Sequence, residues 1–400
     1  MRSIRAGEEA VESLIMKVRE LQPLLRENAS LAEQTRSMTK EVESALRKIG
    51  AFSLMVPTRW GGAGLSMTDY SRVMMEIGAG DLSASWVVQI LNTTSWLGSL
   101  TSDATQEALF SEGTKLICGA PNPPGRARKV AGGYIVSGKW PYSSGSPQAD
   151  WMLGSCLIVA EDGTLSPPGN IVFMPMSGVA IEPSWFVTGL QGTGSDTVAA
   201  YDVFIPDHMM LPSNRSFGYA ETRIRHHGAH SDKMPIVALA RTTNLAQLVG
   251  GAKAMLELIE ADVLKKPLMS TVYKLKADSA VVVHEIGMIA AQLDNAELLL
   301  FDCLEKLDRR ARGGETWTAL ELSRQKAQGA QIINLIHRAI ESIMFLGGSS
   351  AFALANPIQR YWRDIHMALR HITHIPALGY ELYGRDRLHL SPNISPAGAY

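Results

Sequence analysis

The stretch SGKWPYSSGSPQADW, residues 137–151, joins two apolar runs through a pair of adjacent serines and a glycine. Side chains alternate where the stretch begins, and the run WMLGSCLIVA starts at its last residue. Alternation with a period of two, interrupted by Gly and Ser, is typical of two strands with a turn between them. The two hydroxyls have two interpretations. They belong to a polar turn, or they meet a flat polar ligand together with the backbone.

The surrounding sequence predicts a β domain over residues 116–215. Its apolar runs are short and separated by Gly, Pro, Asp and Ser: GGYIVSGKW, WMLGSCLIVA, GNIVFMPM and DTVAAYDVFIP. This spacing leaves no room for crossover helices, so we expect an antiparallel sheet rather than a doubly wound fold.

Helices are expected on both sides of the β domain. Residues 1–115 carry apolar side chains at helical spacing, with Pro23 placed to kink or shorten the first helix. A polar linker is expected over residues 216–233, and a helical domain over 234–400, with long helices near 271–311, 316–346 and 357–387. The sequence therefore predicts an α+β protein that is mostly α.

Composition excludes several classes of function. The chain has 400 residues and a formal net charge of −1, so it lacks the charge of a nucleic-acid or anionic-membrane binder. We expect neither a signal peptide nor a membrane span. The cysteines, Cys118, Cys156 and Cys303, lack metal-ligand spacing and fit reduced thiols in a cytoplasmic protein. The run HHGAH at 226–230 has no nearby carboxylate or cysteine cluster, so no metal is expected.

Five motifs in order resemble the acyl-CoA dehydrogenase superfamily over nearly the whole chain: GGAGLSMTDY, GDLSASW, SGKWPYSSG with ADW, GLQGTGSDTVAAYDVFIP and RYWRDIHMALRHITH. The resemblance implies a flavoprotein with an N-terminal helical domain, a middle β domain and a C-terminal four-helix bundle. Members of the family are usually homotetramers.

The resemblance also implies flavin contacts. The family places the strand end at SSG against the isoalloxazine, which implicates Trp140, Ser143 and Ser144, with Gly119 and Ala120 lining the other approach. The segment LGGSS sits where relatives offer a helix end to a neighbouring subunit's cofactor, which implicates Gly347, Gly348, Ser349 and Ser350. Met344 replaces the glutamine that relatives carry before these glycines, which argues against FAD held in the usual way.

A dehydrogenase of this family needs a carboxylate to remove a proton beside a thioester carbonyl. The family places that glutamate shortly after the pair Arg363 and Asp364, or in the stretch ALARTTNLAQLVGG, and this chain has no Glu at either position. His371 near the first position instead resembles the two-component flavin-dependent monooxygenases. This branch includes p-hydroxyphenylacetate hydroxylase, seco-steroid phenol hydroxylase, dibenzothiophene monooxygenase and nitrososynthases.

The branch implies a mechanism. A separate flavin reductase supplies reduced FMN or FAD, the oxygenase captures O2 as the flavin C4a-hydroperoxide, and one oxygen atom passes to a small aromatic or polycyclic substrate. Ser144 is the candidate partner of flavin N5, and His371 of the peroxide or substrate, with His366 or His374 as replacements. Asp364 lies seven residues before His371, so one straight helix would place both on the same face.

Candidate substrate contacts are Asn92, Thr94, Trp96, Tyr142 and Gln148. Thr94 and Gln148 stand where phenol-hydroxylating relatives carry histidines, so an amine, a sulfur, an enol or a polycycle stays open as the oxygenated group. Three further hypotheses remain: an acyl-CoA dehydrogenase or oxidase-like FAD enzyme with a displaced base, an N-oxygenase of an amine, and a non-catalytic scaffold.

Overall fold

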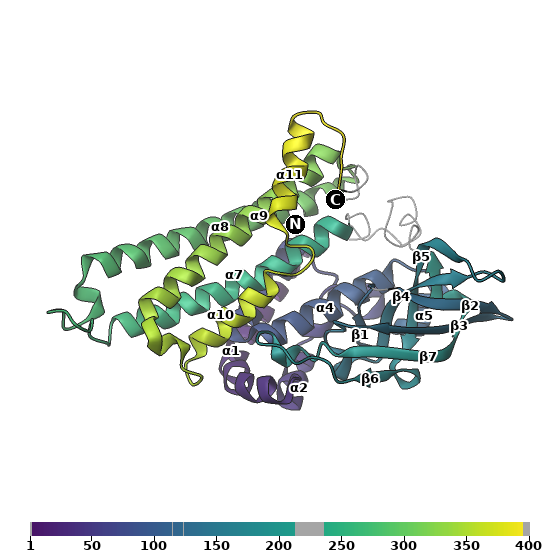
Figure 1. Ribbon diagram of the computed structural model, residues 1–400, viewed down its shortest axis with the longest axis horizontal. Coiled ribbons are helices and arrows are strands. Elements are labelled where there is room, and N and C mark those ends of the chain that lie inside the picture. Colours follow the sequence, from purple (N-terminus) through teal and green to yellow (C-terminus); the bar gives the residue numbers. More distant parts are fainter. Residues whose placement is uncertain (1, 114, 123, 213–235, 395–400) are drawn as a thin grey trace.

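A computed structural model describes residues 2–113, 115–122, 124–212 and 236–394. Long helices occupy one side of the molecule and a sheet the other (Figure 1). The prediction of an α+β, mostly α architecture is confirmed. The predicted linker over 216–233, with the HHGAH run, lies outside the described residues.

The N-terminal part is helical, and side-chain caps mark several of its helix starts. The helices are α1 (Arg2–Thr35), α2 (Lys40–Lys48), α3 (Met67–Gly80), α4 (Leu82–Ser99) and α5 (Asp103–Phe110). Asp81 begins α4, because its side chain accepts from the Ala84 N–H at 2.8 Å. Pro23 lies inside α1 without shortening it, contrary to expectation.

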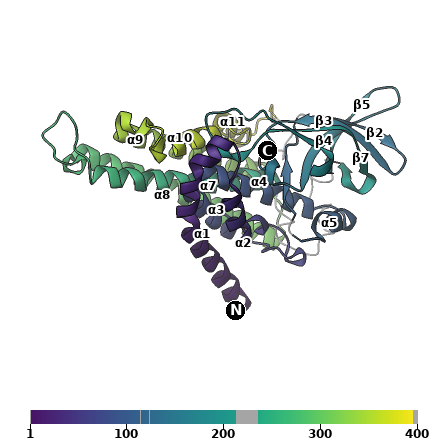
Figure 2. The same ribbon diagram turned by 90° about the horizontal axis from the view of Figure 1, so that it is seen from below.

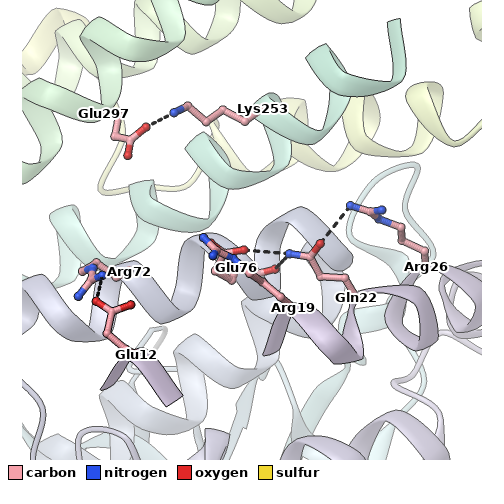
Figure 3. Close-up of polar contacts among 8 residues, drawn as sticks. All are labelled: Glu12, Arg19, Gln22, Arg26, Arg72, Glu76, Lys253 and Glu297. Atoms are coloured by element: carbon pink, nitrogen blue, oxygen red, sulfur yellow. Dashed lines mark hydrogen bonds and ion pairs between the residues drawn. The ribbon is translucent and has the colours of Figure 1, made fainter. Parts of the chain in front are cut away.

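Polar contacts fasten α1 to α3. Arg19 and Gln22 both bond the Glu76 carboxylate, at 2.6 and 3.0 Å, and Arg72 meets Glu12 at 2.5 Å (Figure 3). The N-terminal end of α1 extends away from the rest of the molecule (Figure 2). Such partly exposed pairs contribute little free energy each, so the buried apolar stripe of α1 is the main attachment.

The β domain is one sheet of eight strands, ordered β6-β7-β3-β2-β4-β5-β8 with β1 beside β4. The strands are β1 (Ile117–Gly119), β2 (Gly125–Val130), β3 (Gly133–Trp140), β4 (Trp151–Val159), β5 (Leu165–Pro175), β6 (Ala180–Glu182), β7 (Thr197–Pro206) and β8 (Met210–Pro212). The expectation of a wholly antiparallel sheet is wrong, because β4 pairs in parallel with both β1 and β2.

This topology changes the meaning of the SSG segment. Strand β2 lies between β3 and β4, so residues 141–150 are not a hairpin turn but a connection that passes the end of an intervening strand. Ser143 and Ser144 therefore stand at one end of the sheet, where they meet other elements.

The C-terminal part contains α7 (Ile236–Val263), α8 (Ala280–Gly313), α9 (Ala319–Gly347), α10 (Pro357–Ala368) and α11 (Pro376–Arg387). The single helix expected over 357–387 is two helices, because α10 ends at Ala368 and Pro376 starts α11. The helix expected from residue 271 begins only at Ala280. Among the described residues, no helix is both long and apolar enough for a bilayer.

Helix α4 lies at the centre of the molecule. It contacts β1 and the short helix η5 (Gln191–Thr193) on the sheet side, and α7 and α10 on the bundle side. The neighbouring helix α3 packs backbone to backbone on α7, since a Cβ on Gly78 would lie 2.3 Å from the Gln247 carbonyl oxygen. Side chains of α4 are therefore placed to meet both halves of the protein.

Candidate functional site

Two loops at the sheet end interlock beside α4. The loop of residues 141–148 donates hydrogen bonds to carbonyls of the loop of residues 189–196. The Ser143 N–H donates to the Asp196 carbonyl at 3.2 Å, and the Gly145 N–H donates to the Thr193 carbonyl at 2.9 Å. Ser146 Oγ adds a bond to the Gly194 carbonyl at 3.1 Å. These bonds fix the position of Ser144.

A chain of buried hydroxyls begins at Ser144. Its Oγ lies 2.7 Å from Ser195 Oγ, which lies 2.6 Å from Thr193 Oγ1. Thr193 Oγ1 donates to the Leu190 carbonyl at 2.8 Å. Trp86 of α4 donates its indole N–H to Ser144 Oγ at 3.3 Å. The side chains of α4 and of both loops thus converge on one serine.

The imidazole of His371 lies beside the indole of Trp86. The two ring centroids are 5.5 Å apart, with the planes at 68°. Nδ1 accepts from the Thr373 N–H at 3.4 Å and lies 2.8 Å from Thr373 Oγ1. Burial lowers the pKa of His371. The imidazole is therefore neutral near pH 7, and an accepting Nδ1 leaves the proton on Nε2.

The expectation that Asp364 and His371 share a helix face is wrong, because α10 ends between them. Asp364 is buried, and its Oδ1 accepts from the Leu190 N–H at 2.5 Å. Burial, and next the charge of Asp81, raise the pKa of Asp364 to about 8. This carboxyl supports the loop that carries Thr193 and Ser195, rather than facing Ser144.

The other predicted flavin contacts lie in different surroundings. Ser143 Oγ donates to the Trp140 carbonyl at 2.8 Å, so its proton is used and its oxygen can still accept. Trp140 is fully buried, and its indole donates to the Ser155 carbonyl at 3.0 Å inside the sheet. The Trp140 indole thus packs inside the protein, and its contact with the flavin stays a prediction.

Gly119 and Ala120 lie at the end of β1 against α4. A Cβ on Gly119 would come 2.8 Å from Thr94 Cγ2, so the strand approaches the helix closely. The segment Gly347–Ser350 ends α9 and does not join the Ser144 cluster in the described contacts. Within it, Ser350 Oγ donates to the Gly347 carbonyl at 2.9 Å.

Two predicted substrate contacts, Asn92 and Thr94, make hydrogen bonds within the protein. Asn92 is fully buried. It accepts from the Met55 N–H at 3.1 Å and donates to the Ala51 and Val88 carbonyls at 2.8 and 2.9 Å. Thr94 donates to the Ile90 carbonyl at 2.8 Å, and its hydroxyl also bonds Ile117. Both N–H groups of Asn92 and one lone pair of its amide oxygen are thus used inside the protein, and its role as a substrate contact stays a prediction.

The remaining predicted substrate residues do not form one wall. Trp96 is fully buried, and Gln148 bonds Ser37 Oγ through Nε2 at 2.9 Å. Tyr142 is 66% exposed and lies edge-on to Trp185, with centroids 5.7 Å apart. Trp96 Nε1 and Gln148 Oε1 have no hydrogen-bond partner among the described residues.

His366 belongs to a separate cluster. Its Nε2 lies 2.6 Å from Glu341 Oε1, and His337 brings its own ring nitrogen within 4.8 Å of both ligand atoms. Arg370 lies 3.0 Å from His366 Nδ1, and this positive charge opposes a bound cation. His374, by contrast, is buried beside His371, with ring centroids 5.9 Å apart.

Sequence reasoning missed several site residues. Trp86, Thr193 and Ser195 all lie within motifs that the resemblance uses, but only their contacts connect them to Ser144. Buried amides were also missed. Gln89 Oε1 on α4, with Asn244 Oδ1 and Gln247 Nε2 on α7, has no partner among the described residues. Buried polar atoms without partners are costly in free energy, so these three atoms are candidates for contact with a ligand.

Comparison with known proteins identifies the family. Residues 12–109 match the family model for the acyl-CoA dehydrogenase N-terminal domain, and residues 243–376 match that for the acyl-CoA dehydrogenase C-terminal domain. The oxygenase subunit HsaA of a flavin-dependent monooxygenase from Rhodococcus jostii is 29% identical, over 92% of this chain and 97% of its own. The oxygenase component of a FADH(2)-dependent resorcinol hydroxylase from Rhizobium sp. is 28% identical, over 95% of each chain.

Solved structures show the same fold. XiaF from Streptomyces sp., in complex with FADH2 and glycerol, superimposes with a TM-score of 0.95 at 24% identity, over 99% of this chain and all of that one. The 3-HSA hydroxylase from Rhodococcus sp. RHA1 gives a TM-score of 0.86 at 26% identity, over 95% of this chain and 97% of its own.

Proposed function

The chain belongs to the acyl-CoA dehydrogenase superfamily and is an oxidoreductase of its flavin-dependent monooxygenase branch. We propose that it is the oxygenase component of a two-component system. A separate reductase supplies reduced FMN or FAD, and O2 is the second substrate. Relatives named as oxygenase subunits or components support the division into two proteins.

The observation that carries this proposal is the convergence of Ser144, Trp86 and a neutral His371 where a dehydrogenase would need a carboxylate. Asp364, the acid seven residues before His371, accepts from the Leu190 N–H. With Nδ1 bound to the Thr373 N–H, the neutral ring presents Nε2–H as a hydrogen-bond donor, whereas a carboxylate presents only acceptor oxygens.

The residues present fit a flavin ring edge. Ser144 offers a buried hydroxyl that can donate or accept, and Trp86 covers it from α4. When bound, reduced flavin supplies the electrons and the carbon that activates O2, and in this proposal its C4a-hydroperoxide delivers one oxygen atom. The protein's own contribution is to hold N5 at Ser144, to exclude water, and to present His371 to the oxygen or the substrate.

Burial of this cluster supports the exclusion of water. Ser144, Thr193 and Ser195 are all buried, as is Trp86. Hydroxyls in such surroundings interact more strongly than in water, because the local dielectric is low. A dry site also protects the activated oxygen from loss as hydrogen peroxide.

A small aromatic or polycyclic molecule is the proposed substrate class. The relatives include a resorcinol hydroxylase and an indole-3-acetate monooxygenase from Acinetobacter baumannii, which is 23% identical over 84% of this chain and 83% of its own. Gln89 Oε1, Asn244 Oδ1 and Gln247 Nε2, which lack partners among the described residues, favour a substrate with polar substituents. Two alternative functions are an N-oxygenase of an amine and a dehydrogenase with a displaced base. The isotope-labelling assay described below separates them from hydroxylation.

The proposal includes a homotetramer in the cytoplasm. Large apolar side chains are exposed near the Gly347–Ser350 segment, with Phe345 at 92% and Leu354 at 83%. Exposed apolar groups of this size favour burial by a second copy, which would bring that segment to a neighbouring cofactor. The free, buried cysteines support a reducing compartment. Light scattering on the purified protein measures the subunit number.

Isotope labelling tests the function. The protein, a general flavin reductase, NADH and FMN or FAD are incubated under ¹⁸O2 with a panel of phenols, indoles and aromatic amines. One ¹⁸O atom in a product supports the proposal, and its position on carbon or nitrogen separates hydroxylation from N-oxygenation. Oxidation of acyl-CoA esters with an artificial electron acceptor, and no labelled product, would support the dehydrogenase alternative.

A further inference from the structure

We infer that Thr193 and Ser195 orient the hydroxyl of Ser144 so that it accepts, and does not donate, a hydrogen bond at flavin N5. This makes the two residues positioning residues that select reduced over oxidised flavin. The inference rests on the proposed function, because it takes the flavin edge to lie at Ser144.

The direction of the hydroxyl chain follows from counting protons and acceptors. Each hydroxyl has one proton to donate and two lone pairs to accept with. Thr193 donates to the Leu190 carbonyl, so its oxygen is open to Ser195. If Ser195 donates to Thr193, then Ser144 donates to Ser195, and every hydroxyl proton in the chain has an acceptor.

The opposite direction leaves a proton without an acceptor. If Thr193 donated to Ser195 and Ser195 to Ser144, both lone pairs of Ser144 would be taken, because Trp86 also donates to it. The Ser144 proton would then be buried with no acceptor among the described residues. Leaving a buried donor unpaired is unfavourable, so the chain runs from Ser144 to Leu190.

This direction leaves Ser144 with one free lone pair. One lone pair of Ser144 Oγ accepts from the Trp86 indole N–H, and the Ser144 proton is donated to Ser195. The second lone pair of Ser144 Oγ can therefore accept one further hydrogen bond. Reduced flavin carries a hydrogen on N5 and is a donor there, whereas oxidised flavin has a lone pair at N5. The oriented serine therefore bonds the reduced form and opposes the oxidised form, as suits an enzyme that receives its flavin already reduced.

The end of the chain is held firmly. The Leu190 carbonyl also accepts from the Trp185 indole N–H at 2.9 Å, and the Leu190 N–H is bound by Asp364 at 2.5 Å. Leu190 is in the left-handed backbone region, with φ at 51°. Because both the carbonyl and the N–H of Leu190 are hydrogen-bonded, the carbonyl keeps its position as the final acceptor. The direction of donation along the hydroxyl chain is therefore constant.

The test measures dissociation constants for oxidised and for reduced FMN or FAD under anaerobic conditions. In Thr193→Val, Ser195 loses its acceptor and turns to Ser144, which frees the Ser144 proton for N5. Oxidised flavin should bind more tightly and reduced flavin more weakly. We expect the dissociation constant for oxidised flavin, divided by that for reduced flavin, to fall about tenfold. A change of this size corresponds to the free energy of one or two hydrogen bonds. Ser195→Ala should act in the same direction.

Two variants serve as controls. Thr193→Ser keeps the hydroxyl and should keep the wild-type ratio. Ser146→Ala removes a bond between the same two loops but lies outside the hydroxyl chain, so it should change both constants alike. An unchanged ratio in Thr193→Val and Ser195→Ala, or the same change in Ser146→Ala, would overturn the inference while leaving the proposed function intact. A wild-type protein that binds neither flavin form would overturn both.

Discussion

The imidazole of His371 stands edge-on to the indole of Trp86, with 5.5 Å between the ring centroids. Trp86 comes from the N-terminal helix α4, and His371 from the connection between the C-terminal helices α10 and α11. Trp86 also donates to Ser144 in the β domain. One side chain therefore links all three parts of the chain, so the site exists only when these parts pack together.

Removal of the imidazole should separate oxygen activation from product formation. In His371→Ala we expect reduced flavin still to be oxidised, with at least about a tenfold loss of product per flavin and a matching rise in hydrogen peroxide. His366→Ala is the matched control, because that histidine contacts Glu341 in a different cluster. Unchanged product yield in His371→Ala would remove this residue from the mechanism.

The two serines of the SSG segment should behave differently. Ser144→Ala removes the hydroxyl that Trp86 and Ser195 orient, so affinity for reduced flavin should fall roughly three- to tenfold. Ser143→Ala removes a buried bond to the Trp140 carbonyl, so its main effect should be on the free energy of unfolding. Flavin titration and thermal melts of both variants check this ranking, and the reverse ranking would contradict it.

Asn92→Ala should act on stability. The change leaves the buried Met55 N–H and Ala51 carbonyl without their partner, so the free energy of unfolding should fall by about 2–4 kcal/mol. Denaturant unfolding measures the loss. If the variant melts like the wild type but no longer makes product, Asn92 is a substrate contact and our assignment is wrong.

The raised pKa of the buried Asp364 carboxyl should make the stability of the protein depend on pH. Its pKa rises from 3.8 to about 8, mainly by burial and next by Asp81, with Glu33 also raising it and Arg363 lowering it. Because folding raises the pKa of this carboxyl, it stabilises the fold most when the pH is below its pKa in the unfolded chain. This stabilisation is lost as the pH rises through about 8, the pKa in the folded protein.

Asp364→Asn keeps an oxygen for the Leu190 N–H but does not titrate. The melting temperature of the wild type should therefore fall more steeply between pH 5 and 9 than that of the variant. Asp81, whose pKa is raised in the same direction to about 6, is present in both proteins, and because its charge acts on Asp364 the difference between the curves reports the interacting pair. Parallel curves for the two proteins would show that Asp364 does not titrate in this range.

Motifs and periodicity were sufficient to predict the architecture, but not the strand order. Alternation places residues on strands, yet nothing local in the runs around residue 137 reveals that β2 separates β3 from β4. That separation depends on long-range pairing, and it moves SSG from a hairpin to a connection at the sheet end. Likewise, Pro376 marks a helix start, but the helical pattern of 357–387 conceals the end of α10.

The candidate site was predictable in part. Ser144 and His371 follow from the resemblance, whereas Thr193 and Ser195 are small hydroxyl residues in a glycine-rich loop, where a turn explains them equally well. Their alignment with Ser144 requires the loops to interlock in three dimensions. Asn92 and Trp140 show why a motif alone does not assign a role, because both side chains also make buried hydrogen bonds within the protein.

The most direct test of a protected, imidazole-lined oxygen site is rapid mixing. The protein is combined with reduced FMN or FAD without oxygen, then mixed with oxygenated buffer while absorbance is followed. The account predicts a long-lived absorbance of an oxygen adduct of the flavin before oxidised flavin appears. Direct conversion to oxidised flavin at the rate of free flavin, with both FMN and FAD, would contradict it.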